Sequence, residues 1–371
     1  MSASSESIDR LIDELLAKIA APAHQAKKAL PHPRFTTYLE NLGWVQLFAY
    51  DMNRYYAEAE FNAEMQIRQK LYHLANFDDD SFIGPGLSAS VGMYFEYTLV
   101  GMTVAHQSDG VPIIQCDHPL GRMPDLRRLK PHDFRTSGEM PHLFSLYEDL
   151  KRLVKGRVPV AFPTWQRGPL DLAIQLRGYD QFVTDTFERP AFVHDLMKYL
   201  VQERMRWWEA YCAHFGVTDR TAGISDDWIN IPFISPNMFR DFVLPYYLEL
   251  ERFHGKVPRV HSCGDKVPVQ KYLSQIATLE SHEVNHWTSL EATLRNVPPD
   301  KHLAVSLLNT EVLLADEAKM ERDLRRIITL CKGKRYDVCA QAVEKVHDDM
   351  QEDIRQVKRW IAVTRRIRSE A

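Results

Sequence analysis

The sequence predicts an α/β fold, a single (β/α)8 barrel of the TIM type with an N-terminal helical extension. Beyond residue 75, short apolar runs alternate with helical patterns, as in a parallel sheet whose strands are joined by crossover helices. A chain of 371 residues is long enough for one such barrel. Histidine and cysteine residues fall at predicted strand ends, where these barrels form their active sites. We therefore expect an extension over residues 1–75 and a barrel over residues 76–371.

The individual elements follow from local patterning. Apolar side chains recur at helical spacing over residues 6–20, and a second helical stretch follows over 52–73. Short apolar runs predict strands at 158–162, 223–227, 259–261, 282–286, 303–307 and 336–339. Longer periodic runs predict helices at 170–176, 191–215, 236–253, 267–279, 317–332 and 348–368. Ser235-Pro236 supplies an N-cap serine and a proline at the first helical position.

The composition is that of an ordinary globular protein, with 45% hydrophobic and 26% charged residues. A net charge of −4 gives no electrostatic reason to expect nucleic acid as a partner. No apolar run is long enough for membrane insertion. The five cysteines are few and odd in number, so we expect a reducing cytoplasm rather than a disulfide framework. Three of them are expected to be structural: Cys116, Cys212 and Cys331.

The most informative local pattern is His261-Ser-Cys263-Gly-Asp265. Imidazole and thiolate are the ligand types that zinc prefers, and residues i and i+2 at the end of a strand point the same way. Cys339, far downstream, would complete a three-ligand site with one open position, as in catalytic zinc sites. A His-x-Cys pair also arises often by chance, so the pattern alone is only a hypothesis.

An acidic pair and a second histidine motif lie near other predicted strand ends. Asp226 and Asp227 are adjacent, so in a strand they face opposite ways, and one of them is a candidate general base or an acceptor behind the metal. Capping of the next helix is the alternative role. His282-Glu-x-x-His286 matches the signature of zinc peptidases, which requires a helix. We expect a strand there instead, with His286 as a substrate contact or a fourth ligand.

Four motifs in order resemble the uroporphyrinogen decarboxylase superfamily over roughly residues 120–365. The middle strand and helix of that superfamily are similar to Val158-Pro-Val-Ala-Phe162, Gly168-Pro-Leu170 and Leu176-Arg-Gly178. Its next strand and its Ser-Pro helix are similar to Ser225-Asp-Asp227, Ile234-Ser-Pro236, Phe239 and Pro245-Tyr246. The His261-Ser-Cys263-Gly264 turn is similar to its His-x-Cys-Gly turn. The Arg-x-x-Gly-Arg-type motif of true decarboxylases is not found in residues 47–55.

The branch that this chain resembles holds the zinc-dependent corrinoid methyltransferases, similar to the methylcobamide:coenzyme M enzymes. The resemblance implies His261, Cys263 and Cys339 as zinc ligands. It implies transfer of a methyl group between a corrinoid (cobamide) on a separate partner protein and a small thiol acceptor, with zinc activating the thiolate. Cys339 lacks the glycine-rich surroundings usual in that branch.

The substrate-binding and catalytic residues are less well defined. If the acceptor is a small acid, Arg167 is a candidate for its charged end, although it also fits a solvated surface arginine. Asn309 is a further candidate substrate contact, and Asp226 and Asp227 are the candidate catalytic residues. Two alternatives stay open: a uroporphyrinogen decarboxylase-like lyase with a vestigial His-x-Cys, and a non-catalytic barrel that binds a tetrapyrrole or corrinoid. The sequence does not indicate an oligomeric state.

Overall fold

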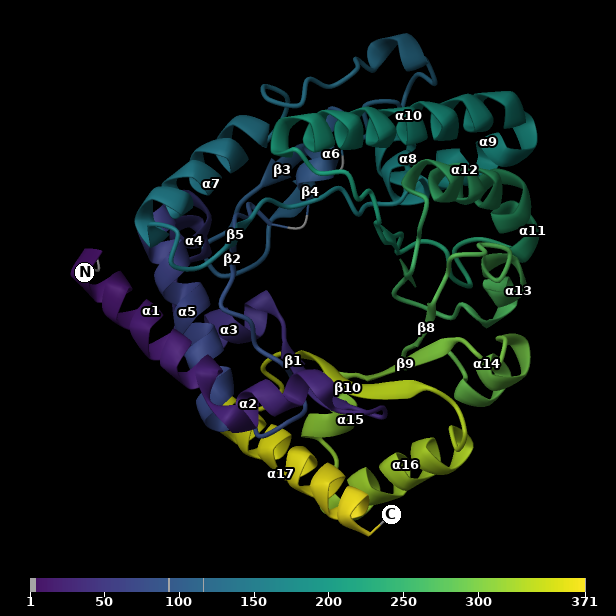
Figure 1. Cartoon of the computed structure of the whole chain (residues 1–371). Helices are drawn as coiled ribbons and strands as arrows, with labels where there is room; N and C mark the ends of the chain where they lie inside the picture. Colours follow the sequence, from purple (N-terminus) through teal and green to yellow (C-terminus); the bar gives the residue numbers. More distant parts are fainter. Residues whose placement is uncertain (1–4, 93, 116, 371) are drawn as a thin grey trace.

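The computed structural model describes residues 5–92, 94–115 and 117–370. Figure 1 shows the strands inside a ring of helices that follow one another in chain order. The C-terminal helix reaches the start of the first strand, since Arg368 near the C-terminus donates a hydrogen bond to the carbonyl oxygen of Pro33. Helices alternate with parallel strands along the chain, which confirms the predicted α/β class. Cys116 lies outside the described residues.

Parallel pairing dominates the sheet. The parallel strands are β1 (Phe35–Leu39), β2 (Leu87–Ser88), β5 (Val160–Ala161), β6 (Ile224–Ser225), β7 (Val260–His261), β8 (Ser281–Val284), β9 (His302–Leu307) and β10 (Tyr336–Val343). They pair in the orders β1-β10-β9-β8, β6-β7 and β2-β5. Parallel bridges Arg259↔Ser281 and Arg167↔Ser225 connect β7 to β8 and the segment after β5 to β6. Within the described ranges the pairings leave β1 and β2 unconnected. β3 (Thr103–Ala105) and β4 (Ile113–Gln115) form an antiparallel hairpin.

The helices alternate with these strands. Before β5 they are α1 (Ser5–Ala20), α2 (Pro22–Ala26), η1 (Lys27–Ala29), α3 (Asn41–Phe48), α4 (Met52–Ala57), α5 (Ala59–Asn76), α6 (Phe95–Leu99), η2 (Leu126–Arg128) and α7 (Met140–Val154). After β5 they are α8 (Pro169–Arg177), α9 (Tyr179–Glu188), α10 (Pro190–Phe215), α11 (Pro236–Met238), η3 (Phe239–Val243), α12 (Leu244–His254), η4 (Val267–Val269), α13 (Gln270–Leu273), α14 (Leu290–Asn296), α15 (Asn309–Leu313), α16 (Glu317–Leu330) and α17 (Met350–Ser369). None of the described helices combines the length and the apolar character that a bilayer crossing needs.

Most predicted elements occur where the sequence places them. Ser235 caps the helical segment that runs to His254, because its hydroxyl oxygen accepts from the backbone N–H of Met238 at 3.1 Å. Residues 282–284 of the histidine motif lie in β8 and His286 follows that strand, so the motif is not on a helix and lacks the geometry that a zinc peptidase requires. The helix predicted over 267–279 is shorter, with only η4 and α13 in that range.

The N-terminal region differs from the helical extension that the sequence predicts. Residues 1–75 include β1, which pairs in parallel with β10, with Phe35 opposite Val338. The first part of the chain therefore supplies a strand to the main sheet as well as helices.

The apolar core packs between strands and helices in two clusters. One extends from α1 through α5, α7, α8, α10 and α12 to Leu279, and the other joins β1, β8, β9 and β10 to α16 and α17. Along β10, Tyr336, Val338 and Ala340 are buried in this second cluster. Because side chains alternate along a strand, Asp337 and Cys339 point to the opposite face of the sheet.

Candidate metal and active site

Parallel pairing of β6 with β7 builds the candidate site. Ser225 lies opposite His261 in this register. Because the strands are parallel, the residues that follow them lie at the same end, and Asp227 comes to lie beside Cys263. His261 and Cys263 are two positions apart and point the same way. Gly264 is required after them, because a Cβ atom there would collide with the side chain of Asn230. The His-x-Cys-Gly sequence thus follows from the strand end and its tight turn.

Three potential ligand atoms meet at these strand ends. The Sγ atom of Cys263 lies 3.2 Å from Oδ1 of Asp227 and 3.4 Å from Nε2 of His261. His261 Nε2 lies 3.4 Å from the same carboxylate oxygen. Cys263 is exposed, and the side chains of His261 and Asp227 are partly exposed, so solvent reaches the group from the strand ends.

The spacing of these atoms fits a tetrahedral ion. Ligands at zinc distances of about 2.0–2.3 Å and tetrahedral angles lie about 3.3–3.7 Å from one another. The three separations of 3.2, 3.4 and 3.4 Å are close to that range. One thiol, one imidazole and one carboxylate are all accepted zinc ligands, and three protein ligands leave a fourth position open.

Glu283 on β8 holds His261 from behind. Its Oε2 atom lies 2.8 Å from Nδ1 of His261 and 3.1 Å from Nζ of the buried Lys266. Burial opposes a charge on His261, but hydrogen bonds with Asp227, Cys263 and Glu283 outweigh it and raise its pKa to about 11. The surroundings of His261 therefore favour positive charge at this point. A carboxylate behind a metal-binding histidine is the usual arrangement, because it fixes the ring and its tautomer.

Arg167 orients Asp227 from the other side. Its guanidinium donates to Oδ2 of Asp227 at 3.0 Å and to Asp171 at 2.6 Å, and the arginine is only 5% exposed. Burial tends to raise the pKa of Asp227, but hydrogen bonding with His261 and the charge of Arg167 lower it well below the usual range. The carboxylate of Asp227 is thus ionised, with one oxygen on Arg167 and the other turned to His261 and Cys263.

Asp226 has a different role from its neighbour. It is fully buried, and its carboxylate accepts from the backbone N–H groups of Leu170 and Asp171 at 3.0 and 2.8 Å. The hydroxyl of Tyr247 donates to it at 2.8 Å. These contacts make Asp226 an acceptor for the first turn of α8, a helix that precedes it in the chain, rather than a cap on the next helix as the sequence suggests.

A family comparison accounts for this arrangement. The family model of uroporphyrinogen decarboxylase (URO-D) matches residues 49–342, which is most of the chain. The chain belongs to the uroporphyrinogen decarboxylase family. Among solved structures, a methyltransferase from Methanosarcina mazei shares the fold at 13% sequence identity, with a TM-score of 0.65 over 95% of this chain and 98% of that one. No curated protein sequence matches the chain significantly.

In this member of the uroporphyrinogen decarboxylase family, Cys339 lies apart from the three clustered atoms. Among the described residues it belongs to neither group of side chains that could hold a metal. The predicted strand ends at Cys339, but β10 continues to Val343, so Cys339 lies in the middle of the strand. Burial and the charges of Asp79 and Asp337 raise the pKa of its thiol to about 11. The structure therefore brings Asp227, and not Cys339, to His261 and Cys263.

The remaining predicted contacts lie at the same end of the strands but outside the cluster. His286 follows β8, is exposed, and pairs with Glu311 at 3.1 Å. Asn309 is the first residue of α15, directly after β9. Arg167 is buried in its two ion pairs and acts on the site through Asp227.

Sequence reasoning missed Glu283 and Lys266. Glu283 is the glutamate of the histidine motif, where a peptidase reading makes it a general base. Along β8, His282 and Val284 are buried on one face, so Glu283 turns to the other face and to His261. The alternation of a strand over 281–284 was the signal that could have placed it.

Proposed function

We propose that this protein is a zinc-dependent methyltransferase that moves a methyl group between a corrinoid protein and a thiol acceptor. The observation that carries the proposal is the convergence of Cys263, His261 and Asp227 on one point, with Glu283 behind the imidazole. The family membership and the shared fold with a methyltransferase support it. Zinc would be held by these three residues, Asp227 taking the position that the sequence assigns to Cys339.

The chain's own residues prepare this chemistry. Glu283 and Lys266 fix the His261 ring so that Nε2 faces Cys263, and Arg167 fixes the carboxylate of Asp227. A bound zinc ion would supply a Lewis acid that keeps an incoming thiol in its nucleophilic, deprotonated form. The acceptor sulfur then forms the new C–S bond with the methyl group, and the electron pair of the broken bond stays with the corrinoid of the partner protein. The reverse transfer uses the same groups.

A docking surface for the corrinoid protein surrounds this end of the strands. Large apolar side chains are exposed on the connections that follow β6, β8 and β9, namely Phe233, Trp287 and Leu314. Exposed apolar side chains of this size are typical of protein contact sites. We also propose that the eight parallel strands close into one (β/α)8 barrel, because pairings and single bridges connect them in order around the ring, with the step between β1 and β2 left open among the described residues.

A decarboxylase of the same family is the competing function. Binding of several carboxylate groups calls for available cations, and Arg167 is committed to Asp171 and Asp227. A lyase in which the His-x-Cys pair is vestigial keeps its activity when Cys263 is replaced, whereas the methyltransferase loses its chemical step.

Zinc analysis of purified variants tests the proposal. We expect about one zinc per chain to be lost in Cys263→Ser and in Asp227→Asn, and kept in Cys339→Ser. Cys212→Ser is the matched control, because Cys212 is a free, half-buried cysteine on α10. Zinc lost in Cys339→Ser and kept in Asp227→Asn would restore the thiolate predicted from sequence as the third ligand. No zinc dependent on Cys263, even after growth with added zinc, would refute the proposed function.

A further inference from the structure

A second group of histidine and carboxylate side chains lies at the opposite end of the parallel strands, where the strands begin. His302 is the first residue of β9, Asp337 the second residue of β10, and His32 lies just before β1. β10 lies between β1 and β9, and all three strands are parallel. The starts of these strands therefore lie side by side, whereas His261 and Asp227 lie where strands end. The two groups occupy opposite ends of the sheet.

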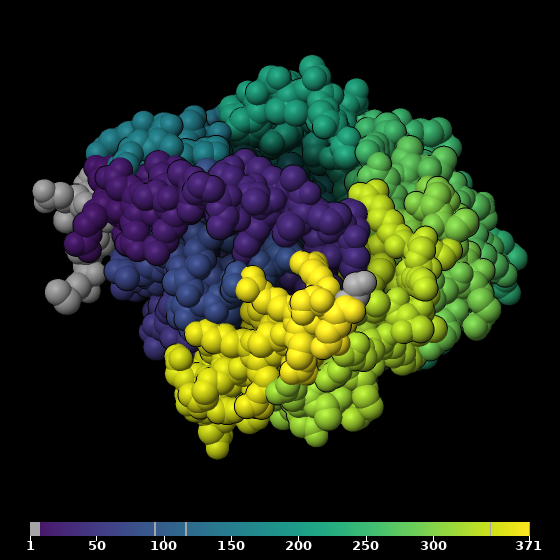
Figure 2. All heavy atoms as spheres, turned by 60° about the horizontal axis from the view of Figure 1, so that its bottom comes forward, coloured from purple at the N-terminus to yellow at the C-terminus, as the bar shows by residue number. Residues whose placement is uncertain are grey.

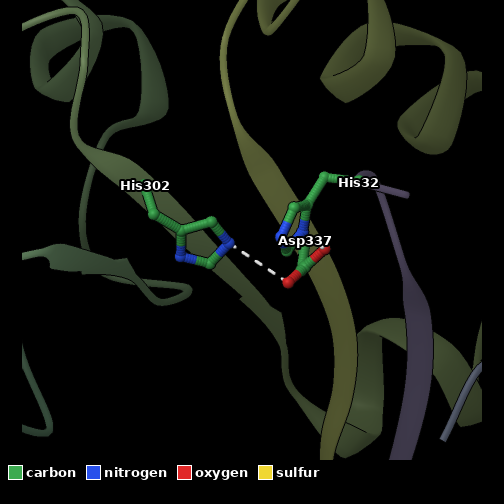
Figure 3. A group of neighbouring side chains, drawn as sticks. All are labelled: His32, His302 and Asp337. Carbon is green, nitrogen blue, oxygen red and sulfur yellow. Dashed lines mark hydrogen bonds and ion pairs between the residues drawn. The ribbon is translucent and has the colours of Figure 1, made fainter. Parts of the chain in front are cut away.

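The three side chains converge on one another (Figure 3). Oδ1 of Asp337 lies 2.6 Å from Nδ1 of His32, and Oδ2 lies 3.1 Å from Nε2 of His302. One ligand atom from each residue lies within 4.8 Å of the other two. The ring centroids are 5.2 Å apart and the rings are inclined by 56°. The imidazoles thus approach the carboxylate without stacking on each other.

Contacts behind the group hold its members in place. Oγ of Ser281 on β8 lies 2.9 Å from Nδ1 of His302, so the other ring nitrogen faces Asp337. The backbone N–H of Arg34 donates to Oδ1 of Asp337 at 2.7 Å. The guanidinium of Arg34 donates to the carbonyl oxygens of Lys28 and Leu30. Such outer contacts orient the ligands of protein metal sites.

The chemistry and accessibility of the group suit a metal ion. Two imidazole nitrogens and one carboxylate oxygen form a known ligand set for zinc and for other divalent first-row transition metals. Their separations of 2.6 and 3.1 Å are hydrogen-bond distances, so the side chains would move apart to about 3.3 Å around a tetrahedral ion. The side chains of His32, His302 and Asp337 are 29%, 15% and 26% exposed, so an ion can enter from solvent. We propose that these three residues bind a divalent transition-metal ion, with water completing its coordination.

The ion would join parts of the chain that are far apart in sequence. His32 and Asp337 are separated by 305 positions. Figure 2 shows the N-terminal and C-terminal segments side by side on one face of the molecule. The residues that bind the ion come together only in the folded chain, so binding stabilises the fold. Its role is to hold the entry into β1 against β10 and β9, independently of any methyl transfer.

Zinc titration of a variant without the strand-end ligands tests the proposal. In the His261→Ala/Cys263→Ser protein, stripped with a chelator and titrated with zinc chloride alone, calorimetry should show one zinc per chain. Zinc should also raise the melting temperature of this protein. Both effects should disappear when His302→Gln or Asp337→Asn is added, with an unchanged far-ultraviolet circular dichroism spectrum showing that the fold is kept.

His347→Gln is the matched control. His347 forms a His–Asp pair with the same 2.6 Å distance and with 32% exposure, but its pair belongs to no three-residue group among the described residues. Zinc binding should survive this change. Zinc binding that is absent in the His261→Ala/Cys263→Ser protein, or unchanged by His302→Gln, would leave the group as a His–Asp–His hydrogen-bond network and overturn the proposal. Anomalous diffraction at the zinc edge from wild-type crystals tests the same point without any variant, with a peak expected between His32, His302 and Asp337.

Discussion

The two ends of the sheet both gather histidine around an aspartate, but they differ in sulfur, in charge and in what stands behind the ligands. At the strand ends, Cys263 adds a thiol, and the half-buried Glu283 forms an ion pair with the buried Lys266 behind His261. At the strand starts there is no sulfur in the group, and Ser281 and a backbone N–H stand behind the ligands. We propose that the first end serves chemistry on a thiol and that the second joins strands. Ligand type and outer contacts, more than the number of histidines, distinguish the two.

The largest expected effect is the loss of methyl transfer in Cys263→Ser. We expect a fall of more than about 100-fold in the rate of thiol methylation, beyond the 10–100-fold usual for changes behind a metal ligand. The assay measures demethylation of the methylated corrinoid protein in the presence of thiol. Wild-type rates in this variant, with Cys212→Ser also at wild-type rates, would contradict a chemical role for this end of the sheet.

Glu283→Gln should weaken zinc binding at the strand ends by about 10–100-fold, because the neutral amide holds the His261 ring less firmly. Competition with a chromogenic chelator measures this affinity. Glu280→Gln is the control, since Glu280 is exposed and pairs with Lys256 outside the site. An equal loss in both variants would point to general surface charge rather than to the contact with His261. Zinc binding at the strand starts should be unchanged in both.

Asp226→Ala should separate stability from metal binding. The change leaves two backbone N–H groups of α8 and the hydroxyl of Tyr247 without their acceptor, which costs about 1–3 kcal/mol of unfolding free energy. Zinc content should stay at the wild-type level in the folded protein. Urea unfolding measures the free energy, with Asp300→Ala in an exposed loop as the control. Normal stability with reduced zinc would move Asp226 from the helix cap into the metal site.

The smallest expected effect is a loss of folding stability at acidic pH, which limits the pH range in which metal binding at the two ends of the sheet can be compared. Burial lowers the pKa of His254 to about 3, below the value of about 6.5 expected in the unfolded chain. The unfolded state therefore binds more protons between these values, and stability falls as the pH drops from 6.5 toward 3. Thermal melts across this range should show the decline, and His254→Gln should reduce it. Metal binding at the two ends is best compared above pH 6.5.

The sequence predicted the residues at the strand ends better than the group of His32, His302 and Asp337 at the strand starts. His261 and Cys263 could be predicted as a pair of ligands because a two-residue spacing within one strand is a local feature of the sequence. Asp227 as their partner depends on the register of β6 against β7, which no local pattern shows. Cys339 was predicted at a strand end because the sequence after Tyr336 does not show that β10 continues to Val343. The longer strand places Cys339 in its middle, away from His261 and Cys263.

The group at the strand starts escaped prediction for a related reason. Pro31 and Pro33 interrupt the periodic pattern just before β1, and the strand itself contains Thr36 and Thr37. Without β1 in the sheet, nothing brings His32 to Asp337. Long-range pairing, rather than any single residue, decides where these side chains meet.

The pairing of β1 with β10 also bears on how the protein is made. On a ribosome that adds about 5–20 residues per second, β1 waits roughly 15–60 seconds for a partner that is about 300 residues later in the chain. During that time one hydrogen-bonding edge of the nascent strand has no partner from β10. A segment that waits for its strand partner can pair with other chains, so we expect the yield of folded protein to depend on chaperones that bind the growing chain.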